Sequence, residues 1–400
     1  MINRPAYLEK LHKWRDTDLV KIVTGIRRCG KSTLFELYQN ELKQSGTARE
    51  QIISINLEDA DNYELLEWKA LHTHIESLLI PNKKNYVFLD EIQQVDGAQR
   101  LLSSLRLKPN IDLYVTGSNA WLLSSELATL ITGRYIEINM LPLSFAEYMS
   151  AFQNEADTGR KYADYISNSS LPRTLTLKDR RDIQDYIMGI YSTIVQKDIA
   201  FHHGIRDISR LDSVARFMFD NIGSETSIRN ISNAMTSGGR KIHQQTVESY
   251  LNGLLGSYVL YKANRYDIKG KQHLLTNAKY YLADIGLRFA LLGNTPGDAG
   301  HILENVVYLE LLRRGYKVFI GKVETREVDF VVQNTGGETE YYQVALTVLE
   351  AKTLNHELEP LRKIKDNYPK YLLTRDWETG SRDGIRQLNV LDWLLGKGGH

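Results

Sequence analysis

The chain has 400 residues, of which 42% are hydrophobic and 25% are charged, and these fractions are typical of a soluble globular protein. Its 50 lysines and arginines nearly balance its 49 acidic residues, which excludes a strong attraction of the whole chain to nucleic acid or to a membrane surface. A local charged patch is compatible with this balance. The length predicts two or three domains rather than one.

The single cysteine, Cys29, excludes an internal disulfide and fits a reducing compartment. No stretch approaches the roughly eighteen uninterrupted apolar residues that a membrane span needs. The first residues also lack the apolar core of a signal peptide. We therefore expect a cytoplasmic protein with no membrane partner.

A phosphate-binding loop is the most informative motif of the chain. It follows the pattern G-x-x-x-x-G-K-S/T, and its residues with the next one are Gly25, Ile26, Arg27, Arg28, Cys29, Gly30, Lys31, Ser32 and Thr33. The apolar run 19–23 before it predicts a buried strand, and segment 31–42 after it has the apolar spacing of a helix. Because a phosphate loop requires this order of strand, loop and helix, we prefer it to a chance match in a glycine-containing turn.

The loop predicts that ATP and Mg²⁺ are the cofactors. Glycines let backbone N–H groups close around phosphate oxygens, and the amino end of the next helix adds the positive end of its dipole. Lys31 is expected to reach the β- and γ-phosphates, and the Ser32 hydroxyl is expected to ligate Mg²⁺.

Residues 1–150 are predicted to form an α/β domain, a parallel sheet with flanking helices, because short apolar runs alternate with helical stretches. The expected strands are 19–24, 52–57, 86–89, 113–116 and 135–138. The tripeptide Met140-Leu141-Pro142 ends this alternating pattern.

Two acids come directly after the expected strand 86–89. Asp90 is expected to hold Mg²⁺ through water, and Glu91 to polarise the attacking water as a general base. An acidic pair alone is weak evidence, since strand ends often carry acids, but a phosphate loop upstream makes the pair strong evidence for an ATPase. A glutamate in this position is typical of the class with an additional strand between the loop strand and the acidic strand, and 113–116 would be that strand.

Ser118 and Asn119 follow the expected strand 113–116, where a polar side chain can touch both the γ-phosphate and the attacking water. The alternative is an ordinary turn, for which these residue types are well suited. Arg134 precedes the next strand and could reach the γ-phosphate of a neighbouring subunit in a homo-oligomer. A surface salt bridge is an equally good interpretation of Arg134.

These motifs resemble those of the prokaryotic AAA-type ATPases that are fused to a C-terminal domain of unknown function. The resemblance covers essentially the whole chain and is carried by residues 23–28, 89–93, 116–119, 133–134, 141–145, 193–199, 265–271 and 303–311. It implies a P-loop ATPase whose C-terminal domain has a restriction-endonuclease-like fold.

After a helical lid or linker region at 151–224, residues 225–292 are expected to form a winged helix-turn-helix. Two helices would flank the turn Gly238-Gly239, and strands 258–263 and 274–282 would form a hairpin with its tip at 267–271. Within 225–272, three acids stand against the basic residues Arg229, Arg240, Lys241, Lys262, Arg265, Lys269 and Lys271. Because this excess is modest, DNA binding and a packing role are both open.

Residues 293–400 are expected to form a small α/β domain. Nucleases of the fold that the resemblance implies gather an acid from a helix, an acid from a strand, and an acid-x-Lys motif around Mg²⁺. Glu304 and Asp329 match the first two positions, but Gln343 and Ala345 stand at the third, where a neutral amide is a poor metal ligand. Glu350-Ala351-Lys352 spells the missing motif beyond the expected strand end, so we predict a nuclease-like domain without cleavage.

Three functions are compatible with the sequence. The first is an ATP-hydrolysing switch that acts on DNA or on a protein partner. The second is a nucleotide-binding scaffold that does not hydrolyse ATP, and the third is an ATP-gated nuclease. Glu91 favours the first over the second, while Gln343 and Ala345 argue against the third.

Overall fold

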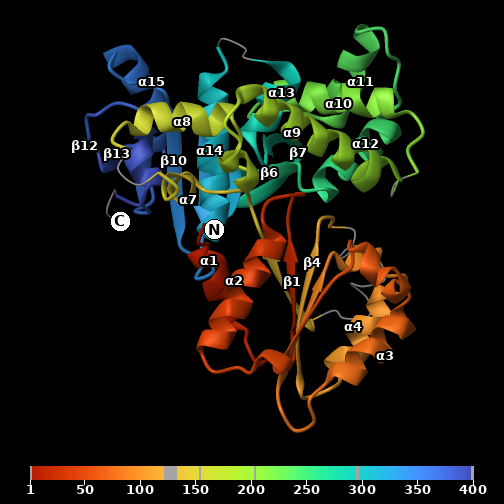
Figure 1. Cartoon of the computed structure of the whole chain (residues 1–400). Helices are drawn as coiled ribbons and strands as arrows, with labels where there is room; N and C mark the ends of the chain where they lie inside the picture. The colour runs from red at the N-terminus through yellow and green to blue at the C-terminus, as the bar shows by residue number, and fades with distance from the viewer. Residues whose placement is uncertain (1, 121–132, 153–154, 202–203, 294–296, 398–400) are drawn as a thin grey trace. The chain divides into compact units, whose positions relative to one another are not determined.

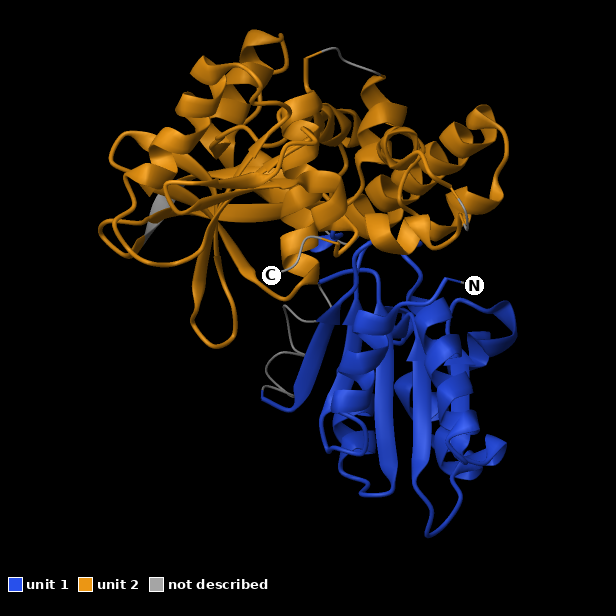
Figure 2. Ribbon diagram, turned by 90° about the vertical axis from the view of Figure 1, so that its left-hand side faces the viewer, with its two compact units in different colours: residues 1–142, 256–258 blue, residues 143–255, 259–400 orange. Residues whose placement is uncertain are grey.

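The computed structural model describes residues 2–120, 133–152, 155–201, 204–293 and 297–397. It divides the chain into two compact units (Figure 2). Unit 1 comprises Met1–Pro142 with Gly256–Tyr258, and unit 2 comprises Leu143–Leu255 with Val259–His400. None of the described helices is both long and apolar enough to cross a membrane.

Unit 1 is an α/β unit, as predicted. Its elements are α1 (Pro5–Lys13), β1 (Val20–Thr24), α2 (Lys31–Gln44), β2 (Ile52–Asn56), α3 (Trp68–Leu78), β3 (Asn85–Asp90), α4 (Ala98–Arg106), β4 (Ile111–Gly117) and β5 (Tyr135–Asn139). Among the described residues, the strands form a five-stranded parallel sheet in the order β2-β3-β4-β1-β5. Strand β4 thus lies between the loop strand β1 and the acidic strand β3, which confirms the prediction of an additional strand.

Helices cover both faces of this sheet. Helices α1 and α2 lie on one face and α3 and α4 on the other (Figure 1). Leu71 of α3 and Leu101 of α4 are fully buried in an apolar core with strand residues such as Val87. On the α2 face the contacts are aromatic, and Phe88 of β3 stacks on Tyr114 of β4 with ring centroids 4.7 Å apart. Packing on both faces holds the strands of the sheet in place. The strands in turn position the loops that follow their carboxyl ends, including the phosphate loop.

Unit 2 contains a group of helices and a mixed sheet. The helices before the sheet are α7 (Phe145–Met149), α8 (Thr158–Ser167), α9 (Arg180–Thr193), a π-helix (Ile194–Phe201), α10 (Ile208–Asp220), α11 (Ile228–Ser237) and α12 (Gln244–Gly256). Helix α7 begins with a capping box, because the Ser144 hydroxyl accepts the Glu147 N–H and the Glu147 carboxylate accepts the Ser144 N–H. This cap explains why the alternating pattern ends near residue 142.

The sheet of unit 2 has eight strands among the described residues, in the order β12-β13-β11-β10-β9-β8-β6-β7. Its elements with the remaining helices are β6 (Leu260–Asp267), β7 (Gln272–Leu282), α13 (Ile285–Leu292), α14 (Ala299–Arg313), β8 (Lys317–Val323), β9 (Arg326–Gln333), β10 (Thr339–Ala345), α15 (Ala351–Arg362), β11 (Lys370–Thr374), β12 (Gly380–Arg382), β13 (Ile385–Asn389) and α16 (Val390–Leu394).

The structure differs from the expected separation between a winged helix-turn-helix and a C-terminal domain. Helices α11 and α12 and the antiparallel hairpin β6–β7 are present where they were expected. However, β6 also pairs in parallel with β8, with Arg265 opposite Ile320, so the hairpin is part of the large sheet. The expected boundary at residue 293 therefore falls inside one compact unit. Strand β6 pairs with β7 on one edge and with β8 on the other, and this second pairing joins the two expected domains. Local residue patterns do not show which strands pair with each other.

Helix α14 is the most deeply buried helix segment next to this sheet. Residues 302–311 are all buried, and the helix packs against β7, β8, β9 and β10. Two of its buried residues, Glu304 and Glu310, are acidic. Since a buried carboxylate needs a partner, these two positions require specific cations nearby.

Candidate nucleotide-binding site

The phosphate loop connects the carboxyl end of β1 to the amino end of α2. Gly25 has a φ of +147°, and a Cβ atom there would lie only 2.2 Å from the carbonyl oxygen of Met140. Gly30 has a φ of +107° and is the N-cap residue of α2. Both conformations favour glycine, and they leave the loop backbone close to a ligand at the helix terminus.

The loop is supported from within unit 1. The Arg4 guanidinium donates to the carbonyl oxygen of Cys29 at 3.2 Å and to that of Leu141 at 2.7 Å. Ile26 and Cys29 are fully buried. Burial raises the pKa of the Cys29 thiol, although Lys31 opposes this shift, so the cysteine is an unreactive packing residue.

Lys31 begins α2 and lies almost completely buried at the centre of the loop. Its Nζ donates to the carbonyl oxygen of Gly25 at 3.2 Å and lies 3.6 Å from Glu91 Oε1. The ammonium group therefore joins the phosphate loop to the acid that follows β3. The sequence had predicted both residues for one site, and the fold brings them together.

Asp90 is the last residue of β3 and faces the first turn of α2. Its carboxylate accepts hydrogen bonds from the hydroxyl groups of Ser32 and Thr116. Burial raises the pKa of Asp90 above its ordinary value, while these two hydrogen bonds oppose the shift. A carboxylate next to a serine hydroxyl is an oxygen-donor set that suits Mg²⁺, so Ser32 and Asp90 fit the predicted metal role.

Glu91 has a left-handed backbone conformation, with a φ of +55°, and its side chain is buried. Its N–H donates to Thr116 Oγ1 at 2.8 Å, and its carboxylate accepts a hydrogen bond from the amide of Gln93. Burial opposes ionisation of this group. Lys31 and Gln93 outweigh burial, and the pKa of Glu91 lies below its ordinary value. Glu91 is therefore ionised at neutral pH, as a general base must be.

The structure brings Ser118 to this site and leaves Arg134 away from it. Ser118 Oγ accepts from Gln93 Nε2 at 3.2 Å, and its hydroxyl also bonds to Glu91. Asn119 is buried next to Ser118, and the following N–H donates to the carbonyl oxygen of Gly256 at 2.7 Å. Arg134 is exposed and precedes β5, at the sheet edge opposite the loop, where its carbonyl oxygen accepts the Val20 N–H.

The remaining loop residues lie at the rim. Arg27 Nη1 is 2.9 Å from Glu58 Oε1, Arg28 is exposed, and Thr33 is half-buried in the first turn of α2. The sequence did not predict the roles of Thr116 and Gln93, whose side chains form hydrogen bonds with Asp90 and Glu91. The signal for Gln93 was its place two residues after Glu91, and the signal for Thr116 was its place at the end of the strand expected beside β3.

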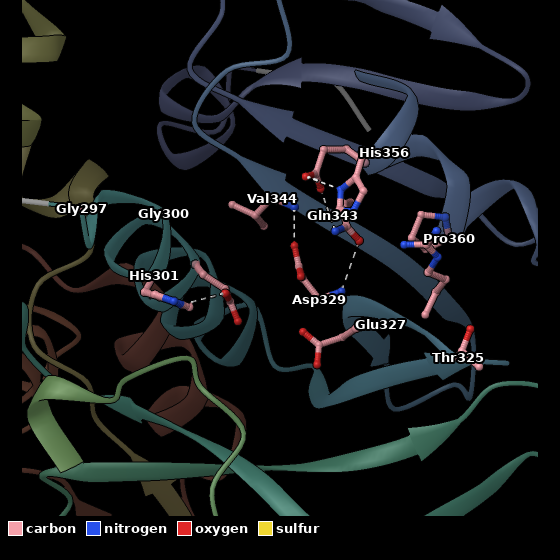
Figure 3. A pocket seen from close by; sticks show the side chains of 13 residues that line it. Gly297, Gly300, His301, Thr325, Glu327, Asp329, Gln343, Val344, His356 and Pro360 are labelled. Atoms are coloured by element: carbon pink, nitrogen blue, oxygen red, sulfur yellow. Dashed lines mark hydrogen bonds and ion pairs between the residues drawn. The ribbon is translucent and has the colours of Figure 1, made fainter. Parts of the chain in front are cut away.

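Unit 2 has a cavity of about 500 Å³ lined by the residues predicted for a nuclease-like centre (Figure 3). Glu304 of α14, Asp329 of β9 and Gln343 of β10 all line it. Both ends of the Gln343 amide are engaged, because Oε1 accepts the Asp329 N–H at 3.4 Å and Nε2 donates to Glu357 at 2.9 Å. Gln343 thus contributes a neutral amide oxygen that already accepts one hydrogen bond, which makes it a weaker metal ligand than the carboxylate expected at this position.

The acid-x-Lys sequence beyond β10 lies elsewhere. Glu350 is the N-cap residue of α15, and Lys352 is an exposed residue of that helix. Neither is among the residues that line the cavity. Ala345 ends β10 and carries no group that could activate water.

The geometry of unit 1 defines a class of protein. A phosphate loop between β1 and α2, a sheet with β4 between β1 and β3, and an aspartate–glutamate pair after β3 make it an α/β P-loop domain of AAA type.

Comparisons with known proteins agree with this class. Residues 17–149 match the family described as AAA domain, and residues 159–298 match a domain of unknown function (DUF8612). An uncharacterized protein of Haemophilus influenzae is 39% identical over 400 residues, which cover 99% of this chain and 99% of that protein. An uncharacterized protein of Methanocaldococcus jannaschii is 30% identical over 367 residues, which cover 87% of this chain and 79% of that protein.

The chain belongs to the same family as these two proteins, with an AAA domain followed by a domain of unknown function. Among solved structures, the Walker-type ATPase PABY2304 of Pyrococcus abyssi is similar with a TM-score of 0.52 and 15% identity. The match covers 73% of this chain and 96% of that one. At this identity the similarity supports the fold alone.

Proposed function

We propose that this protein is a Mg²⁺-dependent ATPase that works as a switch on DNA or on a protein partner. The observation that carries the proposal is the placement of Glu91, ionised and buried, 3.6 Å from the ammonium of Lys31. A protein that only binds nucleotide needs the loop and its lysine. It does not need a carboxylate held next to the position of the outer phosphate.

Binding is assigned to the phosphate loop. The backbone N–H groups around Gly30 and the amino end of α2 would receive the phosphates, and Lys31 would move its contact from Gly25 to the β- and γ-phosphate oxygens. Ser32 and Asp90 would hold Mg²⁺, which when bound neutralises charge on the phosphate oxygens.

Hydrolysis is assigned to Glu91 and the residues that hold it. The carboxylate would accept a proton from the attacking water, and Gln93 and Thr116 would keep its position fixed. Ser118 lies beside Glu91 and is our candidate for the residue that senses the γ-phosphate together with Asn119. Arg134 stays a candidate for a contact to the γ-phosphate of another subunit, since within its own chain it lies at the opposite sheet edge.

The basic residues at 225–272 are the features of the chain that bear on its partner. Of the basic residues at 225–272, Arg265 pairs with Glu225 at 3.0 Å, and Arg240 donates to the carbonyl oxygen of Ser209 at 3.2 Å. The exposed members are Arg229, Arg240, Lys241, Lys262, Lys269 and Lys271. This group supports DNA as a partner, and a protein partner is the alternative.

The proposal is tested by measuring phosphate release from ATP with Mg²⁺, in the presence and absence of double-stranded DNA. Lys31→Ala protein supplies the background rate. We expect turnover above that background, and a change on adding DNA would identify DNA as the partner. Turnover no faster than in the Lys31→Ala protein, together with intact ATP binding by the wild type, would favour a scaffold that does not hydrolyse ATP.

A further inference from the structure

A buried lysine forms ion pairs with two of the acids that line the cavity in unit 2. Lys279 belongs to β7, and its side chain is only 6% exposed. Its Nζ is 3.0 Å from Glu304 Oε1 and 2.6 Å from Glu327 Oε1. Since lysine is rarely buried without partners, these two ion pairs explain its position.

The acids around Lys279 come from two other elements and are held in place by further hydrogen bonds. Glu304 Oε1 also accepts the Tyr281 hydroxyl at 2.5 Å. Asp329 Oδ2 accepts the Val344 N–H at 2.8 Å, as Figure 3 shows. The ammonium thus lies among carboxyl groups that the fold fixes independently of it.

Lys279, Glu304 and Asp329 shift one another's pKa values. Burial alone would lower the pKa of Lys279, but Glu304, Asp329 and Glu327 outweigh burial and raise it. Burial opposes ionisation of Glu304, but Lys279 and its hydrogen bonds leave the pKa of Glu304 below the ordinary value. Burial and the nearby charge of Glu304 raise the pKa of Asp329 well above its ordinary value. Lys279 and Glu304 are therefore both charged, whereas the environment of Asp329 favours its protonated form.

We propose that the ammonium of Lys279 is the resident cation beside this cavity and takes the place that a divalent metal ion would need at Glu304. The proposal concerns unit 2 alone and is independent of ATP hydrolysis in unit 1.

Three features make the cavity a site without a metal ion. Glu304 Oε1 is occupied by Lys279 and Tyr281, and Glu304 Oε2 lies 3.8 Å from His301 Nδ1, so a divalent ion at Oε1 would have to displace Lys279 from one of its two buried ion pairs. Gln343 supplies a neutral amide oxygen where an acid is expected, and this oxygen already accepts the Asp329 N–H at 3.4 Å. Among the described residues, the lining includes the acids Glu304, Glu327, Asp329 and Glu357, while Arg326 of the lining pairs with Glu359 at 3.0 Å. With such a lining and no metal ion, a phosphodiester is repelled rather than bound.

The test is a titration of the nucleotide-free, full-length protein with Mn²⁺, followed by electron paramagnetic resonance of the free ion. We expect Lys279→Met to create one Mn²⁺ site that the wild type lacks. The double variant Lys279→Met with Asp329→Asn should lose that site, and it also serves as the control for any metal bound by unit 1. Lys279→Arg keeps the positive charge and should gain no site.

Thermal unfolding gives a second measurement. Mn²⁺ at about a hundred times its dissociation constant should raise the melting temperature of the Lys279→Met protein by about 5 °C, because the ion binds only the folded state. The wild type should show no such shift.

Two results would overturn the proposal. One is a folded Lys279→Met protein that binds no more Mn²⁺ than the wild type. The other is Mn²⁺ binding by the wild type that Asp329→Asn alone abolishes, and this comparison decides the question even if the Lys279→Met protein does not fold.

Discussion

Thr116 should control hydrolysis without contacting ATP, because its hydroxyl holds both acids of the site. Thr116 Oγ1 accepts the Glu91 N–H at 2.8 Å and donates to the Asp90 carboxylate. Thr116→Val keeps the shape of the side chain and removes both hydrogen bonds. A buried donor left without a partner costs about 1–3 kcal/mol. If this cost falls on the placement of Glu91, the maximal rate should drop by about 10- to 100-fold.

The assay for Thr116→Val is phosphate release at saturating ATP and Mg²⁺, with ATP affinity measured separately by fluorescence titration. Affinity at neutral pH should stay close to wild type, since Lys31 and the phosphate loop are untouched. Thr116 lowers the pKa of Asp90, so its loss should raise that pKa. Because metal binding needs ionised Asp90 and is lost as the pH falls through this pKa, the loss should begin at higher pH in the variant.

Thr116→Ser is the matched control, because it retains the hydroxyl group and should retain the rate. A Thr116→Val protein that hydrolyses ATP at the wild-type rate would refute the reasoning. A Thr116→Ser protein as impaired as Thr116→Val would do the same, because the loss would then come from packing rather than from the hydroxyl.

Three further outcomes are expected. Lys31→Ala should lower ATP affinity in calorimetry by more than about tenfold, or about 1.4 kcal/mol, and unchanged affinity would contradict its role. Gel assays should show no metal-dependent cutting of linear, supercoiled or single-stranded DNA, with or without ATP, and cutting that Asp329→Ala abolishes would contradict this. Lys279→Met should destabilise the protein by about 3–5 kcal/mol in urea unfolding at neutral pH. Burial opposes ionisation of Glu304, but Lys279 lowers its pKa, so the stability from this pair is present above the ordinary glutamate pKa of about 4.3. It is lost as the pH falls below that value through the lowered pKa, and the difference between the two proteins should shrink in that range. A difference that stays constant with pH would contradict the Lys279–Glu304 pairing.

Much of unit 1 could be predicted from the sequence because its signals are local. The strand before Gly25, the helix after Lys31 and the acids after β3 all follow from short patterns of apolar and polar residues. Parallel strands end at one sheet edge, so the patterns also imply that Lys31, Asp90 and Glu91 meet there. The role of Thr116 was harder to predict, because a threonine at a strand end is common. Only the pairing of β3 with β4 brings its hydroxyl next to both Asp90 and Glu91.

Unit 2 was less predictable because its organisation depends on contacts between distant residues. Lys279 stands in an apolar run that reads as an ordinary half-exposed strand, and its partner Glu304 lies 25 residues further along the chain. The parallel pairing of β6 with β8 likewise joins segments separated by β7, α13 and α14. Hydrophobic periodicity reports which face of a strand is buried but not which strand lies beside it.

The most direct test of ATP hydrolysis by this protein is the rate of phosphate release by the wild type and by Glu91→Gln at saturating ATP and Mg²⁺. Glutamine keeps the size of the side chain but cannot accept the proton. The Glu91→Gln protein should bind ATP as the wild type does and hydrolyse it about 10²-fold or more slowly. Equal rates for the two proteins would show that Glu91 is not the base, and the function proposed for unit 1 would have to be abandoned.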